Sequence, residues 1–301
     1  MEQREFIVEQ ETAGQRIDRF LSGEDTGLSR SALQALVAEG HVQCNGKAVA
    51  KSLKLKAGDT VLLEIPDAKP IEAVPQDIPL EIVYEDSHLL VVNKPKGMVV
   101  HPAPGNPDGT LVNALLWHCK GSLSGIGGEI RPGIVHRIDK DTSGLVLAAK
   151  NAYAAPLLAG GVTKLYYAIA QGALPLGEGT IDAPIGRRGD SIIGRCVTPE
   201  GKPSRTEYTI IKEENGLSLA ACVPVTGRTH QIRVHFASIG HPLAGDDLYG
   251  GSRERIARQA LHCARQSFAV PVYTPLPDGI RVEMPLQLRT VTVESPLPPD
   301  M

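Results

Sequence analysis

A polar loop followed by a buried strand is predicted by the stretch Arg131-Pro-Gly-Ile-Val-His-Arg-Ile-Asp-Lys-Asp-Thr-Ser-Gly-Leu-Val-Leu-Ala-Ala-Lys150. Residues 145–149 form a short apolar run of the length expected for a strand in the core. Residues 136–144 are polar and end in Thr-Ser-Gly, which is typical of a loop. This order of elements predicts that Asp139 lies on a loop directly before a core strand.

Asp139 is the candidate reactive group because two cations, Arg137 and Lys140, flank it in the sequence. Neighbouring positive charges favour the ionised form of a carboxylate. An ionised carboxylate in a pocket can act as a nucleophile or as a general base. The same pattern also fits a solvated surface turn that includes Asp141, and the local sequence does not decide between the two.

The composition indicates a folded protein with a sizeable core. Of the 301 residues, 42% are apolar, which argues against wholesale disorder. No apolar run is long enough to span a bilayer, and the charged residues 1–5 do not resemble a secretory signal. The five cysteines are scattered without a Cys-x-x-Cys pair. We therefore expect neither disulfides nor a zinc site, and a reducing, cytoplasmic location.

The charge of the chain gives only weak information about its partner. A formal net charge of −3 argues mildly against nucleic acid, because phosphate contacts require Lys and Arg. The aromatic content of 4% argues against a stacking platform for single strands. The distribution of charge matters more than its sum, however, so a nucleic-acid partner is not excluded.

Residues 1–66 are predicted to form a small N-terminal domain. A helix is expected at residues 29–40, a hairpin turn at Asn45-Gly46 and a strand at residues 60–65. Basic residues around the hairpin could form one face, although nearby acidic residues also fit an ordinary solubilising surface. These basic residues are Arg30, Lys47, Lys51, Lys54 and Lys56.

Four short segments of this region resemble an S4 domain. They are Arg16-Ile-Asp-Arg-Phe-Leu, Ser29-Arg-Ser, Gly40-His-Val-Gln-Cys-Asn-Gly and Ala57-Gly-Asp-Thr-Val, and the resemblance covers residues 14–65. S4 domains bind structured RNA with a helical pair and the following hairpin, which implies RNA contacts by Arg30, Lys47 and Lys51. Residues 67–79 are rich in proline and charge and are typical of a linker, so a second domain is expected at residues 80–301.

The second domain is predicted to contain several strands and few helices. A short helix capped by Thr110 is expected at residues 110–118. Alternation along the strand at 162–170 places Lys164 and Tyr166 on one face and Tyr167 on the other. Strands are also expected at residues 89–94, 205–212 and 217–225.

A second helix is predicted by the other informative stretch, residues 226–242. Thr229 could cap a helix at residues 230–239 and Gly240 could end it, which leaves Arg233 near the helix start. Three apolar residues at i, i+4 and i+7 of this helix are expected to face the core: Ile232, Phe236 and Ile239.

Other chemistries have weaker support in the sequence. His230 and His235 are five residues apart, so a helix does not place them on one face as a His-Glu-x-x-His zinc site requires. No Gly-x-Ser-x-Gly nucleophile motif occurs. Paired glycosidase carboxylates stay open, although Asp139 and Asp141 are too close in the chain to flank a sugar unless the loop separates them.

Four motifs of the second domain resemble the RluA-type pseudouridine synthases. They are residues 131–145, Lys164-Leu-Tyr-Tyr-Ala, Gly201-Lys-Pro-Ser-Arg-Thr-Glu-Tyr, and Thr226-Gly-Arg-Thr-His-Gln-Ile-Arg-Val-His with the following Gly-His-Pro, Gly-Asp and Tyr-Gly. With the S4-like region, the resemblance runs from residue 14 through the second domain. It implies an α+β fold whose catalytic domain has a central mixed, mainly antiparallel sheet flanked by helices.

The resemblance implies a role for each of three distant residues. Asp139 corresponds to the catalytic aspartate, Tyr166 to a tyrosine that stacks on the target base and assists proton removal, and Arg233 to an arginine that pairs with the aspartate. Structural alternatives stay open for these residues. Tyr166 could be a core tyrosine and Arg233 could form a surface ion pair, whereas Arg228 and His230 could serve in capping or loop packing. Contacts to RNA are implied for Arg137, Lys140, Arg187, Arg188, Arg228 and His230.

The implied reaction is the isomerisation of uridine to pseudouridine in RNA by a monomer that needs neither metal nor cofactor. The target nucleotide is flipped out of its RNA context at a cost of roughly a few kcal/mol. Large-subunit ribosomal RNA is implied by analogy with the S4-containing subfamily. Transfer RNA is an alternative, and so is a non-catalytic RNA-binding or ribosome-assembly protein on the same fold.

The sequence departs from the family pattern in two places. The segment 151–161 is short and contains Pro156, which could alter an RNA-contacting edge. Ile138 stands where Leu is commoner.

Overall fold

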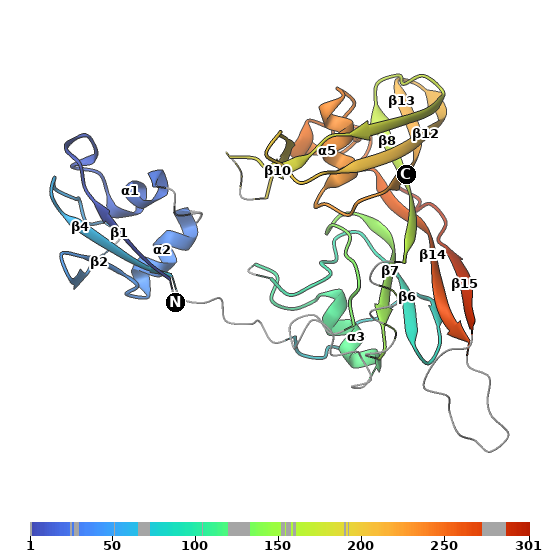
Figure 1. The fold of residues 1–301 in the computed structure, drawn as a ribbon, viewed down its shortest axis with the longest axis horizontal. Helices are drawn as coiled ribbons and strands as arrows, with labels where there is room; N and C mark the ends of the chain where they lie inside the picture. The colour runs from blue at the N-terminus through green and yellow to red at the C-terminus, as the bar shows by residue number, and fades with distance from the viewer. Residues whose placement is uncertain are drawn as a thin grey trace, which may run out of the picture. The chain divides into compact units, whose positions relative to one another are not determined.

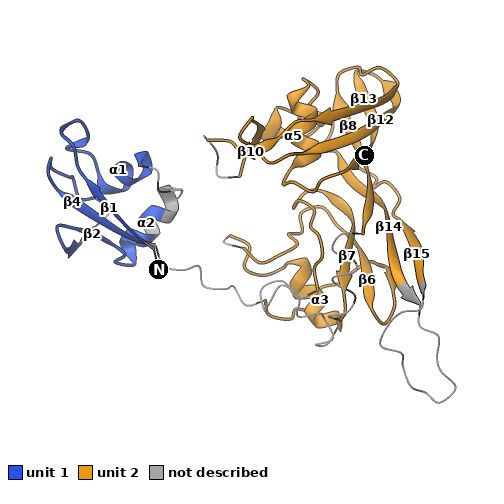
Figure 2. Ribbon diagram, in the orientation of Figure 1, with its two compact units in different colours: residues 1–69 blue, residues 70–301 orange. Residues whose placement is uncertain are grey.

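The chain divides into two compact units, Met1–Lys69 and Pro70–Met301, which Figure 2 shows in different colours. The structure is a computed structural model. No helix among the described residues is long and apolar enough to cross a membrane. The described residues are 2–24, 26, 30–50, 52–65, 73–103, 105–119, 133–151, 154, 158, 161–189, 191, 193–272 and 287–301.

The first unit is a four-stranded antiparallel sheet packed against two helices. The strand order is β1 (Glu2–Ile7), β4 (Thr60–Ile65), β2 (Val42–Cys44) and β3 (Lys47–Ala48), with α1 (Ile17–Gly23) and α2 (Arg30–Ala38) beside it. Asn45 and Gly46 both have positive φ, of 51° and 76°, as the predicted tight hairpin turn requires. Strand β1 was not predicted, because its first residues, Glu-Gln-Arg-Glu, are polar.

The core of the first unit lies between the helices and the sheet. The helices contribute Ile17, Leu21 and Leu33, each 0% exposed, and β4 contributes Val61 and Leu63, also 0% exposed. Burying such side chains stabilises a domain by about 1.5–3 kcal/mol each. The apolar spacing of α2 and the alternation of β4 were therefore sufficient to predict both elements.

The second unit is organised around one nine-stranded mixed sheet (Figure 1). The strand order is β5-β6-β7-β14-β8-β13-β12-β9, and β15 pairs with β14. All pairings are antiparallel except β7 with β14, so the predicted α+β fold with a mixed, mainly antiparallel sheet is confirmed. The strands are β5 (Ile82–Glu85), β6 (Leu89–Lys94), β7 (Ser143–Ala149), β8 (Thr163–Gln171), β9 (Gly177–Asp182), β12 (Arg205–Glu214), β13 (Leu217–Pro224), β14 (Leu261–Val272) and β15 (Gln287–Glu294).

Helices are few in the second unit, and they lie on the sheet. Helix α3 (Leu111–Cys119) begins after Thr110, whose hydroxyl accepts a hydrogen bond from the Asn113 N–H at 3.4 Å, which confirms the predicted cap. Helix α5 (Gln231–Ser238) packs on β12 and β13 (Figure 1). A short 3-10 helix, η3, spans Asp247–Tyr249.

The parallel pairing of β7 with β14 brings the Asp139 loop to the middle of the sheet. All seven residues of β7 are buried, as predicted from the apolar run. Gly144 pairs with Cys263 at a φ of 110°, and a Cβ at position 144 would lie 2.3 Å from the Cys263 carbonyl oxygen. Cys263 in turn pairs with Tyr166 of β8, so β14 joins the loop of the aspartate to the strand of the tyrosine.

Helix α5 differs from the prediction at both ends. It begins at Gln231 and not at His230, because His230 has a left-handed φ of 58° and Thr229 makes no cap. The Gln231 side chain instead accepts the Arg228 N–H at 3.0 Å. Ile239 is 37% exposed and does not face the core, since the helix has already ended at Ser238.

A hairpin that was not predicted lies before β12. It consists of β10 (Ile185–Arg187) and β11 (Arg195–Val197). Within residues 152–160, only Ala154 and Leu158 are described, and both are helical and buried. The rest of that segment, including Pro156, lies outside the described residues.

Candidate active site

Asp139 and Arg233 form an ion pair at the centre of the site. Arg233 lies on α5, and its Nη1 donates a hydrogen bond to Asp139 Oδ2 at 3.0 Å. Asp139 lies on the loop before β7 and keeps 17% of its side-chain surface exposed, whereas Arg233 keeps 8%. The fold thus brings together a carboxylate and a guanidinium from two distant motifs, and the carboxylate is the more exposed of the two.

A second carboxylate, Asp246, fixes the orientation of Arg233. It accepts hydrogen bonds from Arg233 Nε at 2.7 Å and from Nη2 at 2.8 Å, and it is 1% exposed. Burial opposes the charge of Arg233, but the hydrogen bonds to Asp246 and the charge of Asp139 outweigh burial and raise the pKa of the guanidinium. Because the guanidinium is a rigid fork, binding one edge to Asp246 leaves Nη1 directed at Asp139.

His230 approaches the second oxygen of Asp139 and is itself in contact with Tyr249. His230 Nε2 lies 3.8 Å from Asp139 Oδ1, and its Nδ1 lies 2.7 Å from the Tyr249 hydroxyl. The ring of Tyr249 also lies against Arg233, whose Cζ is 5.1 Å from the ring centroid. Tyr249 therefore touches both side chains that face the aspartate.

The hydrogen bonds of Tyr249 favour one tautomer of His230. The backbone N–H of Arg195 donates to the Tyr249 oxygen at 3.0 Å, so the Tyr249 O–H is available to donate to His230 Nδ1. Burial lowers the pKa of His230, against the opposing charge of Asp139, and this favours the neutral imidazole. A neutral imidazole that accepts at Nδ1 carries its hydrogen on Nε2, the atom that faces Asp139.

Tyr166 supplies a buried phenol to the same cavity. Its side chain is 8% exposed on β8, and Cys263 of the neighbouring strand β14 lies opposite it in the sheet. Burial, followed by Cys263 and the charge of Asp139, raises the pKa of Tyr166 well above its ordinary value. The phenol is therefore neutral at physiological pH. Among the described residues that line the cavity, Tyr166 is present and Tyr167 is not.

A cavity of about 430 Å³ joins these groups, a volume in the usual range for small-ligand pockets. Asp139, Tyr166 and His230 lie on its wall, together with apolar side chains such as Val135 and Ile232. Arg137 and Arg228, both exposed, also line the cavity. The site therefore combines one carboxylate, one phenol and basic groups around a space that is part apolar.

Residues 88–238 match the model of the RNA pseudouridylate synthase family. The chain belongs to this family. Residues 15–61 match the S4 domain model, so both resemblances seen in the sequence are confirmed. The activity is accordingly the isomerisation of uridine to pseudouridine in RNA. The glycosidase alternative is excluded, and the competing interpretation as a non-catalytic binding protein is not supported.

Relatives of this RNA pseudouridylate synthase align along nearly its whole length. "Ribosomal large subunit pseudouridine synthase D" of Zymomonas mobilis is 45% identical over 290 residues, covering 90% of this chain and 91% of the relative. "Uncharacterized RNA pseudouridine synthase YlyB" of Bacillus subtilis is 42% identical over 307 residues, covering 100% and 96%. The solved structure "Human RNA Pseudouridylate Synthase Domain Containing 1" is 26% identical with a TM-score of 0.53, covering 78% and 94%.

Three other predicted RNA-contacting residues of the second unit, Lys140, Arg187 and Arg188, do not line the cavity. Lys140 is exposed and donates to Asn106 Oδ1 at 3.4 Å. Arg187 lies on β10, and Arg188 follows it and donates to the Leu248 carbonyl at 3.3 Å. Lys47 is exposed on β3 of the first unit. The side chain of Arg30 and the whole of Lys51 lie outside the described residues.

Asp246, Tyr249 and Cys263 were missed by the sequence reasoning. The segment Gly245-Asp-Asp-Leu-Tyr-Gly was matched to a motif of the family resemblance, but no role was assigned to its two acids or its tyrosine. The contact of Cys263 with Tyr166 had no local signal, because strand pairing creates it. Within the described part of the chain, no group of three or more His, Cys, Asp or Glu could hold a metal ion.

Proposed function

We propose that this enzyme isomerises specific uridines of large-subunit ribosomal RNA and that Asp139 is the catalytic residue. The observation that carries the proposal is the pairing of Asp139 with Arg233 at 3.0 Å on the wall of a cavity that also holds Tyr166. The ribosomal target is supported by the relative named ribosomal large subunit pseudouridine synthase D, with 45% identity over 90% of this chain.

In the proposed mechanism, the target uridine enters the cavity after it is flipped out of its RNA context. Asp139 either attacks C1′ or drives loss of a proton at C2′, and the bond from N1 to C1′ breaks. The detached uracil rotates and bonds to C1′ through C5. On the first route this bond displaces the Asp139 carboxylate from C1′, and on the second route a proton returns to C2′. The C5 proton is then lost and N1 gains a proton, so the product is an isomer of the substrate. Arg233 directs the carboxylate through a hydrogen bond of 3.0 Å, and His230 Nε2 lies 3.8 Å from its other oxygen.

Tyr166 is proposed to pack against the uracil as a neutral ring. Its raised pKa favours the protonated phenol, so any part in removing the C5 proton requires that the phenol first transfer its own proton. Replacing Tyr166 by Phe keeps the ring and removes only the hydroxyl. This substitution separates the stacking role from the role in proton removal.

A tritium-release assay tests the catalytic assignment. RNA labelled with tritium at uridine C5 loses the label to water when the base rejoins through C5. We expect Asp139→Asn to lower kcat by on the order of 10³-fold or more, because it removes the reacting carboxylate and keeps the shape. RNA binding should stay within about twofold of the wild type. Release by Asp139→Asn at the wild-type rate would refute the role of Asp139.

The same assay tests the RNA target. Unmodified large-subunit ribosomal RNA and an unmodified transfer RNA pool should be compared as substrates. We expect release from the ribosomal RNA and none from the transfer RNA. The opposite pattern would favour the alternative of a transfer-RNA enzyme, which shares the chemistry and differs only in substrate.

The organisation of the chain supports a further part of the proposal. Residues 1–66 would bind RNA as the S4 domain, residues 67–79 would act as a linker, and residues 80–301 would carry the reaction. We propose that the enzyme acts in the cytoplasm as a monomer, without metal or cofactor. Activity that persists after dialysis against a chelator, at a concentration where sedimentation shows one species, would support this.

A further inference from the structure

The backbone of the Asp139 loop is held from behind by two buried cations. The carbonyl oxygen of Asp139 accepts the Thr142 N–H at 3.2 Å. The next carbonyl, of Lys140, accepts a hydrogen bond from Lys94 Nζ at 3.0 Å, and the carbonyl of Asp141 accepts one from Arg258 Nη1 at 3.1 Å. Three successive carbonyls of the loop therefore have fixed donors, and two of these donors are basic side chains.

Arg258 joins the loop to the start of β14. Its side chain is 6% exposed, and Nη1 also donates to the carbonyls of Gln259 at 3.1 Å and Leu261 at 3.2 Å. Its Nη2 donates to Ser143 Oγ at 3.2 Å, at the point where the loop enters β7. One guanidinium thus spans the loop and the strand that carries Cys263.

Asp300 balances the buried charge of Arg258. It accepts hydrogen bonds from Arg258 Nε at 2.9 Å and Nη2 at 3.0 Å, so the pair is bidentate. Lys96 Nζ donates to Asp300 at 2.7 Å as well. Asp300 lies beyond β15, in a segment held by the hydrogen bond of Ser295 N–H to the Ala264 carbonyl at 2.8 Å.

We propose that Asp300 is a positioning residue for catalysis. It holds Arg258, Arg258 holds the carbonyl of Asp141 and the hydroxyl of Ser143, and the loop then presents Asp139 to Arg233. The proposal rests on the proposed role of Asp139 and adds a residue 161 positions further along the chain, outside all four motifs of the family resemblance. Asp300 does not line the cavity, so its action passes through Arg258.

Two physical arguments support this role. Removing one partner of a buried ion pair leaves the other charge without compensation, which is strongly unfavourable. Arg258 without Asp300 is therefore expected to move toward solvent or toward another acceptor and to release the Asp141 carbonyl. A shift of the loop by a fraction of an ångström lengthens the 3.0 Å distance between Asp139 and Arg233, and catalysis depends on such geometry.

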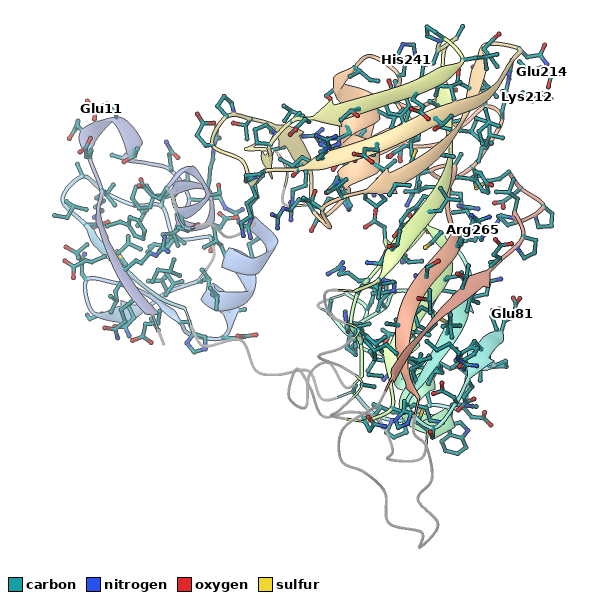
Figure 3. All side chains as sticks on the ribbon, turned by 45° about the vertical axis from the view of Figure 1, so that its right-hand side comes forward. Glu11, Glu81, Lys212, Glu214, His241 and Arg265 are labelled. Carbon is teal, nitrogen blue, oxygen red and sulfur yellow. The ribbon has the colours of Figure 1, made fainter. Side chains whose placement is uncertain are left out.

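The experiment compares tritium release by the full-length wild type, Asp300→Asn, Asp300→Glu and Asp139→Asn on unmodified large-subunit ribosomal RNA. The matched control is Glu294→Gln, which breaks an exposed ion pair with Arg265 of β14 (Figure 3) and is close to Asp300 in sequence. Circular dichroism and thermal unfolding give the folded fraction of each variant. Single-turnover rates and RNA binding separate kcat from affinity.

We expect Asp300→Asn to lower kcat by about tenfold, which corresponds to about 1.4 kcal/mol, with KM within about twofold. Asp300→Glu keeps the charge and should lie between Asp300→Asn and the wild type, and Glu294→Gln should equal the wild type. A double variant with Arg258→Lys should add little to Asp300→Asn, because the two residues act as one unit.

Three results would overturn the inference: an unchanged kcat, a loss of activity that only follows the folded fraction, or a rise in KM alone. The Asp139→Asn variant separates the test of Asp300 from the test of Asp139 as the catalytic residue. If Asp139→Asn is inactive and Asp300→Asn is fully active, only the positioning role of Asp300 fails. If Asp139→Asn is active, the catalytic assignment itself fails.

Discussion

Asp246 binds Arg233 through two hydrogen bonds, of 2.7 and 2.8 Å, on the edge of the guanidinium that faces away from Asp139. Asp246 is almost completely buried, so it has no role in contacting RNA directly. Its effect is to direct the third nitrogen of the guanidinium, Nη1, toward Asp139. The relationship explains why α5 and the segment that follows it must pack together before the site is complete.

We expect Asp246→Asn to lower kcat by about 10- to 100-fold, because an amide cannot accept both hydrogen bonds of the guanidinium fork. The matched control is Asp247→Asn, whose carboxylate is exposed and paired with the exposed Arg253 at 2.8 Å. Single-turnover tritium release measures both. Equal rates for the two variants would contradict a role for Asp246 in directing Arg233.

Tyr249→Phe should change the titration of His230. The substitution removes the O–H that donates to Nδ1, so Nδ1 becomes free to hold a proton and the pKa of His230 should rise. Nuclear magnetic resonance titration of the histidine rings and the pH dependence of kcat measure this shift. Tyr84→Phe, which removes a hydroxyl bonded to Asp86 at 2.8 Å, is the control and should leave His230 unchanged. A His230 titration that is the same in both variants would refute the assigned tautomer.

The burial of Lys94 should make the free energy of unfolding depend on pH. It is fully buried and donates to the carbonyls of Pro95, Met98 and Lys140. Burial lowers its pKa to about 7 against the opposing charges of Asp141 and Asp139, whereas its ordinary value is 10.5. Between these values the unfolded chain binds more protons than the folded one, so this group makes the free energy of unfolding rise with pH in that window.

Urea unfolding of the wild type and Lys94→Met at two pH values checks this expectation. The wild type should gain stability relative to the variant between about pH 7 and pH 9, because only the wild type carries the titrating ammonium. A constant difference between the two proteins would show that the three carbonyl acceptors keep Lys94 charged throughout this range.

The basic residues around the S4 hairpin should contribute to RNA binding. Replacing Lys47, Lys51, Lys54 and Lys56 together by Gln should weaken binding and flatten its salt dependence, by about 0.7–0.9 in logarithmic slope for each phosphate that the variant no longer neutralises. Binding measured across a series of salt concentrations gives the slope. Lys212→Gln, an exposed lysine of β12 in the catalytic domain that is labelled in Figure 3, serves as the control. An unchanged slope would contradict the basic face.

The sequence carried enough information for the main strands because their side chains are buried in regular patterns. Strand β7 is buried along its whole length and β8 alternates, and both were predicted for these reasons. Strand β1 was missed because its polar residues form the edge of the sheet, where pairing with β4 holds them. The start of α5 was misplaced because His230 adopts a left-handed conformation, and nothing in the neighbouring sequence indicates this.

Within the site, Asp139, Tyr166 and Arg233 came from motifs of a family resemblance. Asp139 and Tyr166 line one cavity, and Arg233 is paired with Asp139. Asp246 and Asp300 could not be assigned in the same way. Each acts on an arginine that is distant in the sequence, and such a partnership depends on tertiary packing. The sequence motifs therefore located Asp139, Tyr166 and Arg233, but not the carboxylates that bind the arginines.

The close approach of Gly144 to Cys263 has a consequence for how the enzyme could be inactivated without touching any reacting group. The parallel pairing between β7 and β14 involves only two residue pairs, and position 144 is one of them. A single methyl group at that position would act as a wedge between the strands and push the acid away from the phenol. The absence of a Cβ at position 144 thus permits the close approach of β7 and β14.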